Sequence, residues 1–330
     1  MKRHFKNIAA ALLPFFLSYT LLSGCSVTTQ PSVKTGFYFN TAIVLTCYGD
    51  NAEEVLEKAM QLCGRYEKLF SRTVKNSDIW NLNHAKGQPV IVSEETALLL
   101  KKAVSYAQLT DGKIDPTITP LSELWNFSGD PRGPVPDAEK IRALLPHVDY
   151  RNILIEGTSV RLADPQSEVD LGFIAKGYIA DQLKAFFLEN GVKSALINLG
   201  GNVLAVGEKP DGSPFYTGIK KPFGEANETV GIVELRDRSL VSSGSYERCF
   251  EQDGILYHHI LDPSTGYPAD TGLSGVTILS SSSMEGDALS TSCFLLGLEK
   301  GRELIESLPD TEALFVTDDG FVYQTSGFLD

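Results

Sequence analysis

Asp287 and Thr291 are the two residues whose types and spacing point most directly to chemistry. They are four residues apart, and the apolar run 293–296 that follows them is compatible with a helix. On a helix, residues i and i+4 lie one above the other, so the carboxylate and the hydroxyl would face the same point. Such hard oxygen ligands suit Mg²⁺ better than zinc or copper. Taken alone, however, this pair is more often a helix cap or part of a solvated helix face.

A second segment, 258–268, combines His258 and His259 with Asp262 and a turn rich in proline and glycine. Histidine has an ordinary pKa that suits proton transfer near neutral pH. This segment could therefore supply a general base, although turn formation alone would also explain its composition.

Loop segments elsewhere have the composition of ligand-binding backbone. Segment 170–177 leads into a predicted helix, so its N–H groups and the positive end of the helix would face an anion, with Lys176 nearby. The glycines of 198–202 and 242–245 would let a flat ligand or a phosphate approach the backbone. Segment 110–117 contains an Asp-Gly turn and an Asp-Pro kink. Each of these segments could equally be an ordinary turn.

The elements that position these segments are of mixed type. Apolar spacing and capping residues predict helices over 51–70, 77–82, 93–109, 137–145, 174–190, 284–297 and 300–307. Strands are predicted over 37–48, 152–155, 160–162, 194–197, 203–206, 216–220, 229–235, 239–242, 255–261, 275–279, 313–317 and 321–323. Because many strands follow one another directly, we expect an α+β fold with antiparallel sheet.

The order of the motifs is more specific than any one of them. The chain contains, in sequence, Asp-Gly-x-x-Asp-Pro-Thr, Asp-Leu-Gly-x-Ile-Ala-Lys-Gly-Tyr, Asn-Leu-Gly-Gly-Asn, Ser-Gly-x-Tyr, His-x-x-Asp-Pro-x-Thr-Gly and Asp-Ala-x-x-Thr. Over residues 36–330 this series resembles the ApbE family of FAD:protein FMN transferases. The resemblance implies a two-lobed, T-fold-like α+β body with mixed or antiparallel sheets and flanking helices. It also implies Mg²⁺-dependent transfer of FMN from FAD to a Thr or Ser hydroxyl of an acceptor protein, with release of AMP.

The resemblance assigns roles to single residues. It implies a metal site made by Asp287, Thr291 and the backbone carbonyl of Phe173, whose side chain is then irrelevant to ligation. It suggests His259 as the base that takes the proton of the acceptor hydroxyl, while Asp262 could be the base instead or could fix the loop. The positions that match FAD-binding segments are Phe39, Asn40, Thr73, Lys113, Ile114, Asp115, Asp170, Lys176, Ser243, Gly244, His259 and Ile260.

Two positions depart from the family pattern. Phe39-Asn40-Thr41 stands where many relatives have Met-Gly-Thr, and Thr73 stands where many have an aromatic residue. Hydrolysis of FAD needs only water in place of the acceptor hydroxyl. Two alternatives therefore stay open: an Mg²⁺-dependent FAD pyrophosphatase that gives FMN and AMP, and a flavin-binding lipoprotein without catalysis.

Residues 1–24 have the pattern of a signal peptide. Lys2, Arg3 and Lys6 precede the apolar stretch 8–22, which is short for a membrane span of about 20 apolar residues. Leu-Ser-Gly-Cys at 22–25 resembles a bacterial lipobox, which predicts acylation of Cys25 and a polar tether over 25–35; a chance cysteine after an ordinary signal peptide is the alternative. Since several acyl chains anchor a protein stably, we expect a lipid-anchored protein on the extracytoplasmic face of the cell membrane or the periplasmic side of the inner membrane. The family resemblance adds an expected acceptor, a flavoprotein subunit of an extracytoplasmic redox complex.

Composition agrees with a large folded body and excludes some partners. Hydrophobic residues make up 42% of the chain, enough for one big domain or two intimate lobes. The formal net charge is −13, and removal of residues 1–24, with three basic and no acidic residues, would make it −16. Such a charge argues against binding nucleic acid or adsorbing to anionic lipid. Beyond Cys25, the four cysteines have no C-x-x-C spacing, which argues against a zinc site.

Overall fold

The computed structural model describes residues 30–129, 133–225 and 227–328. The predicted signal peptide and the predicted acylation site at Cys25 fall outside these residues. Within the described ranges, no helix combines the length and the apolar composition that a membrane crossing requires.

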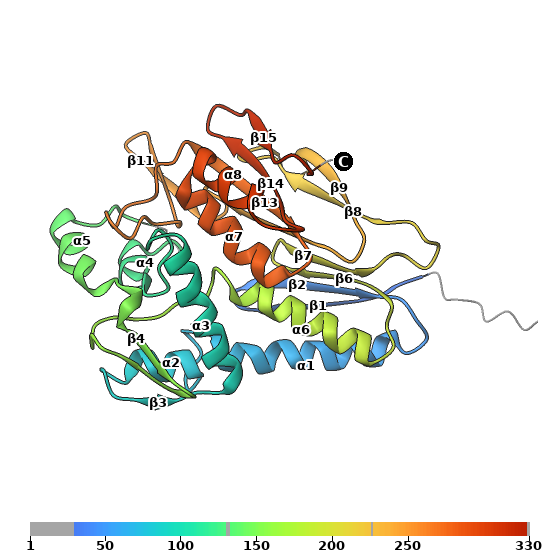
Figure 1. The fold of residues 1–330 in the computed structure, drawn as a ribbon, viewed down its shortest axis with the longest axis horizontal. Coiled ribbons are helices and arrows are strands. Elements are labelled where there is room, and N and C mark those ends of the chain that lie inside the picture. Colours follow the sequence, from blue (N-terminus) through green and yellow to red (C-terminus); the bar gives the residue numbers. More distant parts are fainter. Residues whose placement is uncertain (1–29, 130–132, 226, 329–330) are drawn as a thin grey trace, which may run out of the picture.

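The body is built on an eight-stranded sheet whose neighbouring strands all run antiparallel (Figure 1). This sheet confirms the predicted α+β class. In spatial order its strands are β1 (Ser32–Tyr38), β2 (Thr41–Cys47), β6 (Ser194–Leu199), β7 (Asn202–Gly207), β10 (Ser239–Gly244), β13 (Leu273–Ser280), β14 (Glu312–Thr317) and β15 (Val322–Gln324).

The two faces of this sheet are covered by different elements. Alternate residues of a strand point to opposite faces; in β7, Leu204 and Val206 join the core beneath the helices, whereas Val203 and Ala205 join a second core. That second core is closed by the hairpin of β8 (Phe215–Lys220) and β9 (Thr229–Leu235). The helices on the first face are α1 (Ala52–Phe70), α6 (Ala175–Glu189), α7 (Ser283–Leu296) and α8 (Leu298–Glu306).

The sheet and the elements that cover it form one lobe, and a second group of elements, beside one end of the sheet, forms the second lobe (Figure 1). It comprises α2 (Asp78–His84), α3 (Glu94–Leu109), α4 (Thr119–Trp125), α5 (Ala138–Leu144), the 3₁₀ turns Leu145–His147 and Tyr150–Asn152, a small sheet of β3 (Val90–Ile91), β5 (Ser159–Leu162) and β4 (Ile153–Glu156), and a hairpin of β11 (Cys249–Gln252) and β12 (Ile255–His258). An aromatic cluster around the buried Trp125 holds the β11–β12 hairpin to α4, with Phe250 and Tyr257 on the hairpin side.

The predicted helices are present, and side-chain caps explain where several of them begin. Ser77 accepts a hydrogen bond from the Trp80 N–H, and Ser93 accepts one from Thr96 N–H, so each serine starts the helix that follows it. Asp137 does the same for α5.

The prediction of one strand over 37–48 is wrong. The chain turns back at Phe39 and Asn40, whose φ angles are 54° and 57°, and β1 and β2 form a hairpin. This is the arrangement of a type I′ turn, which usually contains glycine and therefore went unrecognised. The predicted tether also ends too late, because Ser32–Thr35 belong to β1, where exposed residues such as Val33 alternate with half-buried ones such as Lys34.

Other boundaries differ for similar local reasons. The strand predicted over 255–261 ends at His258, since the chain leaves the hairpin at His259 and forms the turn 262–267. The short elements β3, β11 and α4 were not predicted. Each has seven residues or fewer, and α4 has a proline in its first turn, so they lack a recognisable period.

Candidate active site

The buried carboxylate of Asp287 lies where α6 and α7 meet. Its Oδ2 accepts a hydrogen bond of 2.8 Å from the Gly177 N–H in the first turn of α6. Its Oδ1 lies 3.4 Å from the Lys176 ammonium nitrogen. Only 4% of the Asp287 side chain is exposed, so this charge is compensated by a helix N-terminus and by a cation.

Gly177 permits the close approach of the two helices. A Cβ at this position would lie 2.2 Å from the Ser283 carbonyl oxygen and 2.7 Å from Asp287 Cβ. No side chain fits in that space. The glycine therefore brings the start of α6 directly against the first turns of α7.

Phe173 and Thr291 lie next to this contact. The Phe173 carbonyl is the regular i−4 partner of the Gly177 N–H, but that N–H donates to Asp287. Within the described residues no hydrogen bond ends on the Phe173 carbonyl oxygen. Thr291 lies one helical turn after Asp287, and its hydroxyl is 3.0 Å from the hydroxyl of Ser243 on β10.

This donor set fits a hard divalent ion. It comprises a carboxylate, a hydroxyl and a free carbonyl, and Lys176 already brings a positive charge to the same carboxylate. No group of three or more His, Cys, Asp or Glu side chains suited to a metal occurs in the described ranges. A site here would therefore depend on backbone and hydroxyl oxygens, with open positions left for substrate oxygens or water.

The loop before α6 is held in place at Asp170, near its start. Asp170 accepts a hydrogen bond of 2.7 Å from the Gly172 N–H and one of 2.9 Å from Arg72 Nε. Arg72 also pairs with Glu123 of α4 at 2.5 Å. The loop that carries the Phe173 carbonyl is thus tied to the end of α1 and to the second lobe. The neighbouring Thr73 is exposed, and its hydroxyl contacts the Ser71 hydroxyl at 3.2 Å.

His259 is held neutral beside this loop. Burial lowers its pKa to about 3, and the nearby positive charges of Arg248 and Lys176 act in the same direction. Its Nδ1 is buried and has no hydrogen-bond partner among the described residues. A neutral imidazole with an unpaired nitrogen is in the form that accepts a proton, and the low pKa makes it a weak base while it is buried. His258, in contrast, is a packed residue whose Nε2 contacts the Ala269 carbonyl oxygen at 3.1 Å.

Asp262 is occupied by contacts within its own loop and with Lys113. Burial raises the pKa of its carboxyl, but hydrogen bonds from Ser264 and from Lys113 outweigh burial and lower the pKa below its ordinary value. The distance from Lys113 Nζ to Asp262 Oδ2 is 3.0 Å. Of the two roles considered for Asp262, these contacts favour the one that fixes the loop.

Several predicted FAD-binding residues lie in the core or in loop contacts. Ile114 and Ile260 are buried in the cluster that packs against α7. Asp115 is buried and accepts hydrogen bonds from the Thr117 N–H, the Thr117 hydroxyl and the Tyr150 N–H. Gly244 lies in β10, where a Cβ would be 2.3 Å from the Tyr246 ring.

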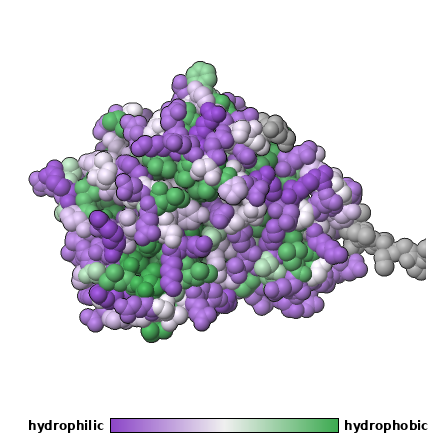
Figure 2. All heavy atoms as spheres, viewed as in Figure 1, coloured by the Kyte–Doolittle hydropathy of each residue, from purple (hydrophilic) through white to green (hydrophobic). Residues whose placement is uncertain are grey.

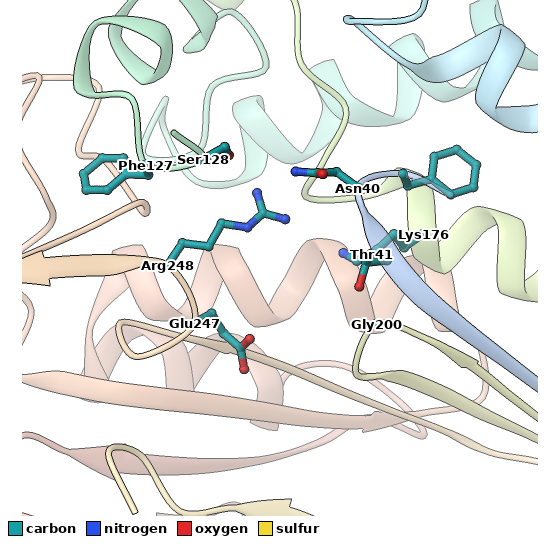
Figure 3. Close-up of a pocket in the computed structure, with 9 residues that line it drawn as sticks. Asn40, Thr41, Phe127, Ser128, Lys176, Gly200, Glu247 and Arg248 are labelled. Atoms are coloured by element: carbon teal, nitrogen blue, oxygen red, sulfur yellow. The ribbon is translucent and has the colours of Figure 1, made fainter. Parts of the chain in front are cut away.

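A cavity of about 280 Å³ opens between the two lobes (Figure 3). Three of the predicted residues, Phe39, Asn40 and Lys176, line it. In Figure 3 the side chains of Asn40 and Arg248 extend toward the same space from opposite sides. The remaining lining residues are Thr41, Phe127, Ser128, Gly200 and Glu247.

Residues 39–315 match the ApbE family. The chain belongs to the ApbE family. It is 41% identical to an FAD:protein FMN transferase of Klebsiella pneumoniae (strain 342), over 83% of this chain and 85% of that protein. It is 36% identical to an FAD:protein FMN transferase of Treponema pallidum (strain Nichols), over 83% of this chain and 80% of that protein.

Solved structures of ApbE proteins have the same fold. The ApbE protein of Thermotoga maritima MSB8 superposes with a TM-score of 0.84 at 33% identity, covering 91% of this chain and 98% of the other. The flavin transferase ApbE of Vibrio cholerae gives a TM-score of 0.81 at 29% identity, with the same coverage.

Arg248 lines the cavity of this ApbE protein but was not predicted from the sequence motifs. It forms no ion pair with any described carboxylate, although the chain is strongly acidic. Two signals could have pointed to it: it follows the Ser-Gly-x-Tyr motif by two residues, and it precedes the β11–β12 hairpin that carries the histidines. Phe127 gave no local signal, because its place depends on stacking against Trp125, at 5.5 Å between ring centroids.

Proposed function

We propose that this protein transfers FMN from FAD to an acceptor protein. Its similarity to FAD:protein FMN transferases over most of both chains supports the reaction class. The single structural observation that carries the proposal is the buried Asp287 carboxylate, set against Lys176 and the free Phe173 carbonyl beside the cavity.

We further propose that Asp287, Thr291 and the Phe173 carbonyl hold Mg²⁺. When bound, the ion would neutralise charge on the diphosphate of FAD, where negative charge increases in the transition state. The chain adds fixed positive charge of its own. Lys176 and Arg248 both line the cavity, and a guanidinium with no ion-pair partner among the described residues is well suited to phosphate oxygens.

The reaction proposed here joins the acceptor Ser or Thr hydroxyl oxygen to the phosphorus of the FMN half. The bond from that phosphorus to the bridging oxygen breaks, and AMP leaves with its electron pair. His259 is the candidate base for the hydroxyl proton, because its imidazole is neutral and its Nδ1 lacks a partner within the described ranges. Asp262 and Lys113 hold the turn that follows this histidine.

The cellular setting is also a proposal. The lipobox-like Leu-Ser-Gly-Cys at 22–25 supports acylation of Cys25 and attachment to the extracytoplasmic face of the membrane. An acceptor there would be a flavin-bearing subunit of an extracytoplasmic redox complex. Mass spectrometry of membrane-extracted protein tests this, because an unmodified N-terminal peptide containing Cys25 would contradict acylation.

One incubation tests the proposed activity. The purified protein is mixed with FAD, Mg²⁺ and an acceptor domain that carries a Ser or Thr flavinylation motif, with Asp287→Ala as the matched control. Flavin fluorescence on the denatured acceptor, together with AMP in equal amount, supports transfer. AMP without labelled acceptor would instead identify an FAD pyrophosphatase, and intact FAD would leave only a flavin-binding protein.

A further inference from the structure

Asp181 of α6 reaches across to the first turn of α7. Its Oδ1 accepts a hydrogen bond of 2.8 Å from the Ser283 N–H. Its Oδ2 accepts one of 3.0 Å from the Met284 N–H and one of 2.8 Å from the Ser282 hydroxyl. Both carboxylate oxygens are therefore committed to the beginning of the neighbouring helix.

The same contact occurs in the opposite direction. Asp287 of α7 accepts the N–H of Gly177 at the beginning of α6. Gly177 and Asp181 are four residues apart, and so are Ser283 and Asp287, so each helix offers an N–H and a carboxylate one turn apart on one face. The two helices hold each other through this reciprocal pair of contacts.

The Asp181 contacts are more than a helix cap. Helix α7 already has its own N-cap in Ser282, whose hydroxyl accepts a hydrogen bond of 3.3 Å from the Glu285 N–H. Asp181, on another helix, binds the Ser283 and Met284 N–H groups, which the Ser282 hydroxyl does not bind. Its bonds join α7 to α6 and fix how far α7 can slide or rotate.

We propose that Asp181 is a positioning residue for the metal site. Phe173 leads directly into α6, whereas Asp287 and Thr291 lie on α7. The three donors therefore face one point only while the two helices keep one relative position. Asp181 maintains that position through its bonds to Ser282, Ser283 and Met284. This inference rests on the proposed function, because it assumes that those three groups bind the ion.

Replacing Asp181 with asparagine removes one of the two acceptor oxygens and the charge at the helix N-terminus. At least one backbone N–H of α7 then loses its partner. Residues that orient metal ligands without touching the metal typically change metal affinity by 10–100-fold when mutated. We expect Asp181→Asn to weaken Mn²⁺ binding about tenfold, measured on the full chain by calorimetry and by electron paramagnetic resonance without turnover.

A matched control separates positioning from general stability. Asp78 of α2 also binds the start of another helix, because its Oδ2 accepts the Ser93 N–H at 2.8 Å and the Thr96 hydroxyl at 2.7 Å. It caps α3, which carries no proposed metal ligand. Asp78→Asn should lower the melting temperature but bind Mn²⁺ as the unsubstituted protein does. Ser282→Ala removes one of the bonds to Asp181 and should give an intermediate loss of Mn²⁺ affinity, even if Asp181→Asn does not fold.

Unchanged Mn²⁺ affinity in Asp181→Asn, or an equal loss in Asp78→Asn, would overturn the positioning role and leave the proposed function standing. Absence of Mn²⁺ and Mg²⁺ binding by the unsubstituted protein would overturn the metal site itself, and this inference with it.

Discussion

Gly177→Ala is the substitution whose effect follows most directly from the geometry. The added Cβ would meet the Ser283 carbonyl oxygen at 2.2 Å, whereas real Cβ contacts stay above 3.0 Å. The atom that it meets is backbone, so the helices themselves have to separate, by about 1 Å. The Gly177–Asp287 hydrogen bond, now 2.8 Å, would stretch to about 3.8 Å, which is beyond hydrogen-bonding range.

The clash should change both the free energy of unfolding and the rate of flavin transfer. Overpacking of a close contact typically costs about 1–3 kcal/mol, and replacing a helical glycine by alanine returns about 1 kcal/mol. The broken Gly177–Asp287 hydrogen bond adds about 1 kcal/mol, so we expect a net loss of about 1–3 kcal/mol in the free energy of unfolding. Because a misplacement of about 1 Å at a reactive centre costs about 100-fold in rate, kcat/KM for flavin transfer should fall by roughly that factor.

Urea unfolding and the acceptor-labelling assay measure these two quantities. The control is Gly231→Ala, where a Cβ meets no heavy atom within 4 Å, so both stability and activity should be preserved. If Gly177→Ala keeps the stability and the kcat/KM of the unsubstituted protein, the argument that α6 and α7 need this close contact is wrong.

Three further predictions concern Arg248 and His259. Arg248→Ala should raise the dissociation constant for FAD about 10- to 100-fold by removing a charged hydrogen bond worth about 1.5–3 kcal/mol, whereas Arg302→Ala, on the exposed surface of α8, should leave it unchanged in a fluorescence titration. His259→Gln should lower kcat for transfer at least about 100-fold with little change in FAD affinity; equal losses in both would contradict the assignment as base. Folding lowers the pKa of His259 from 6.5 to about 3. Below pH 6.5 the unfolded chain therefore binds more protons than the folded protein, and the free energy of unfolding declines as pH falls from 6.5 toward 3. Urea unfolding over that range should show a shallower decline for His259→Gln than for the unsubstituted protein.

The sequence predicted the regular elements well because caps and apolar periods are local signals. Ser77 and Ser93 begin their helices as expected, and α1 follows its apolar spacing to Phe70. The hairpin turn at Phe39–Asn40 was missed, since an aromatic residue with positive φ is favoured only by its surroundings, here a 2.7 Å hydrogen bond from the Phe39 N–H to Glu67 of α1.

The same holds for the site: features encoded locally in the sequence were predicted, and features that depend on packing between distant segments were not. The i, i+4 spacing indicated that Asp287 and Thr291 share a helix face, and the motif at 170–177 indicated a loop near an anion. Neither signal could reveal that Gly177 and Asp181 contact α7, because that depends on how two helices separated by about a hundred residues pack. Arg248 was missed for a similar reason, since one arginine among many gives no sign of lacking a carboxylate partner.

The hydrophobic residues left on the surface are scattered among polar ones in the view of Figure 2, apart from a green area over the lower part of the second lobe. Ile91 and Leu98, both in that lobe, are 74% and 49% exposed. They belong to β3 and α3, and neither is among the residues that line the cavity.

Strand β1 connects the N-terminal side of the folded body with the wall of the cavity, because it starts at Ser32 and ends next to the Phe39–Asn40 turn (Figure 1). Its seven residues at about 3.3 Å each amount to a rigid spacer of roughly 20 Å. If Cys25 is acylated as proposed, β1 would keep the membrane attachment at least a strand's length from the cavity where the acceptor hydroxyl has to bind. That spacing would leave room for a folded acceptor domain between the membrane and the cavity.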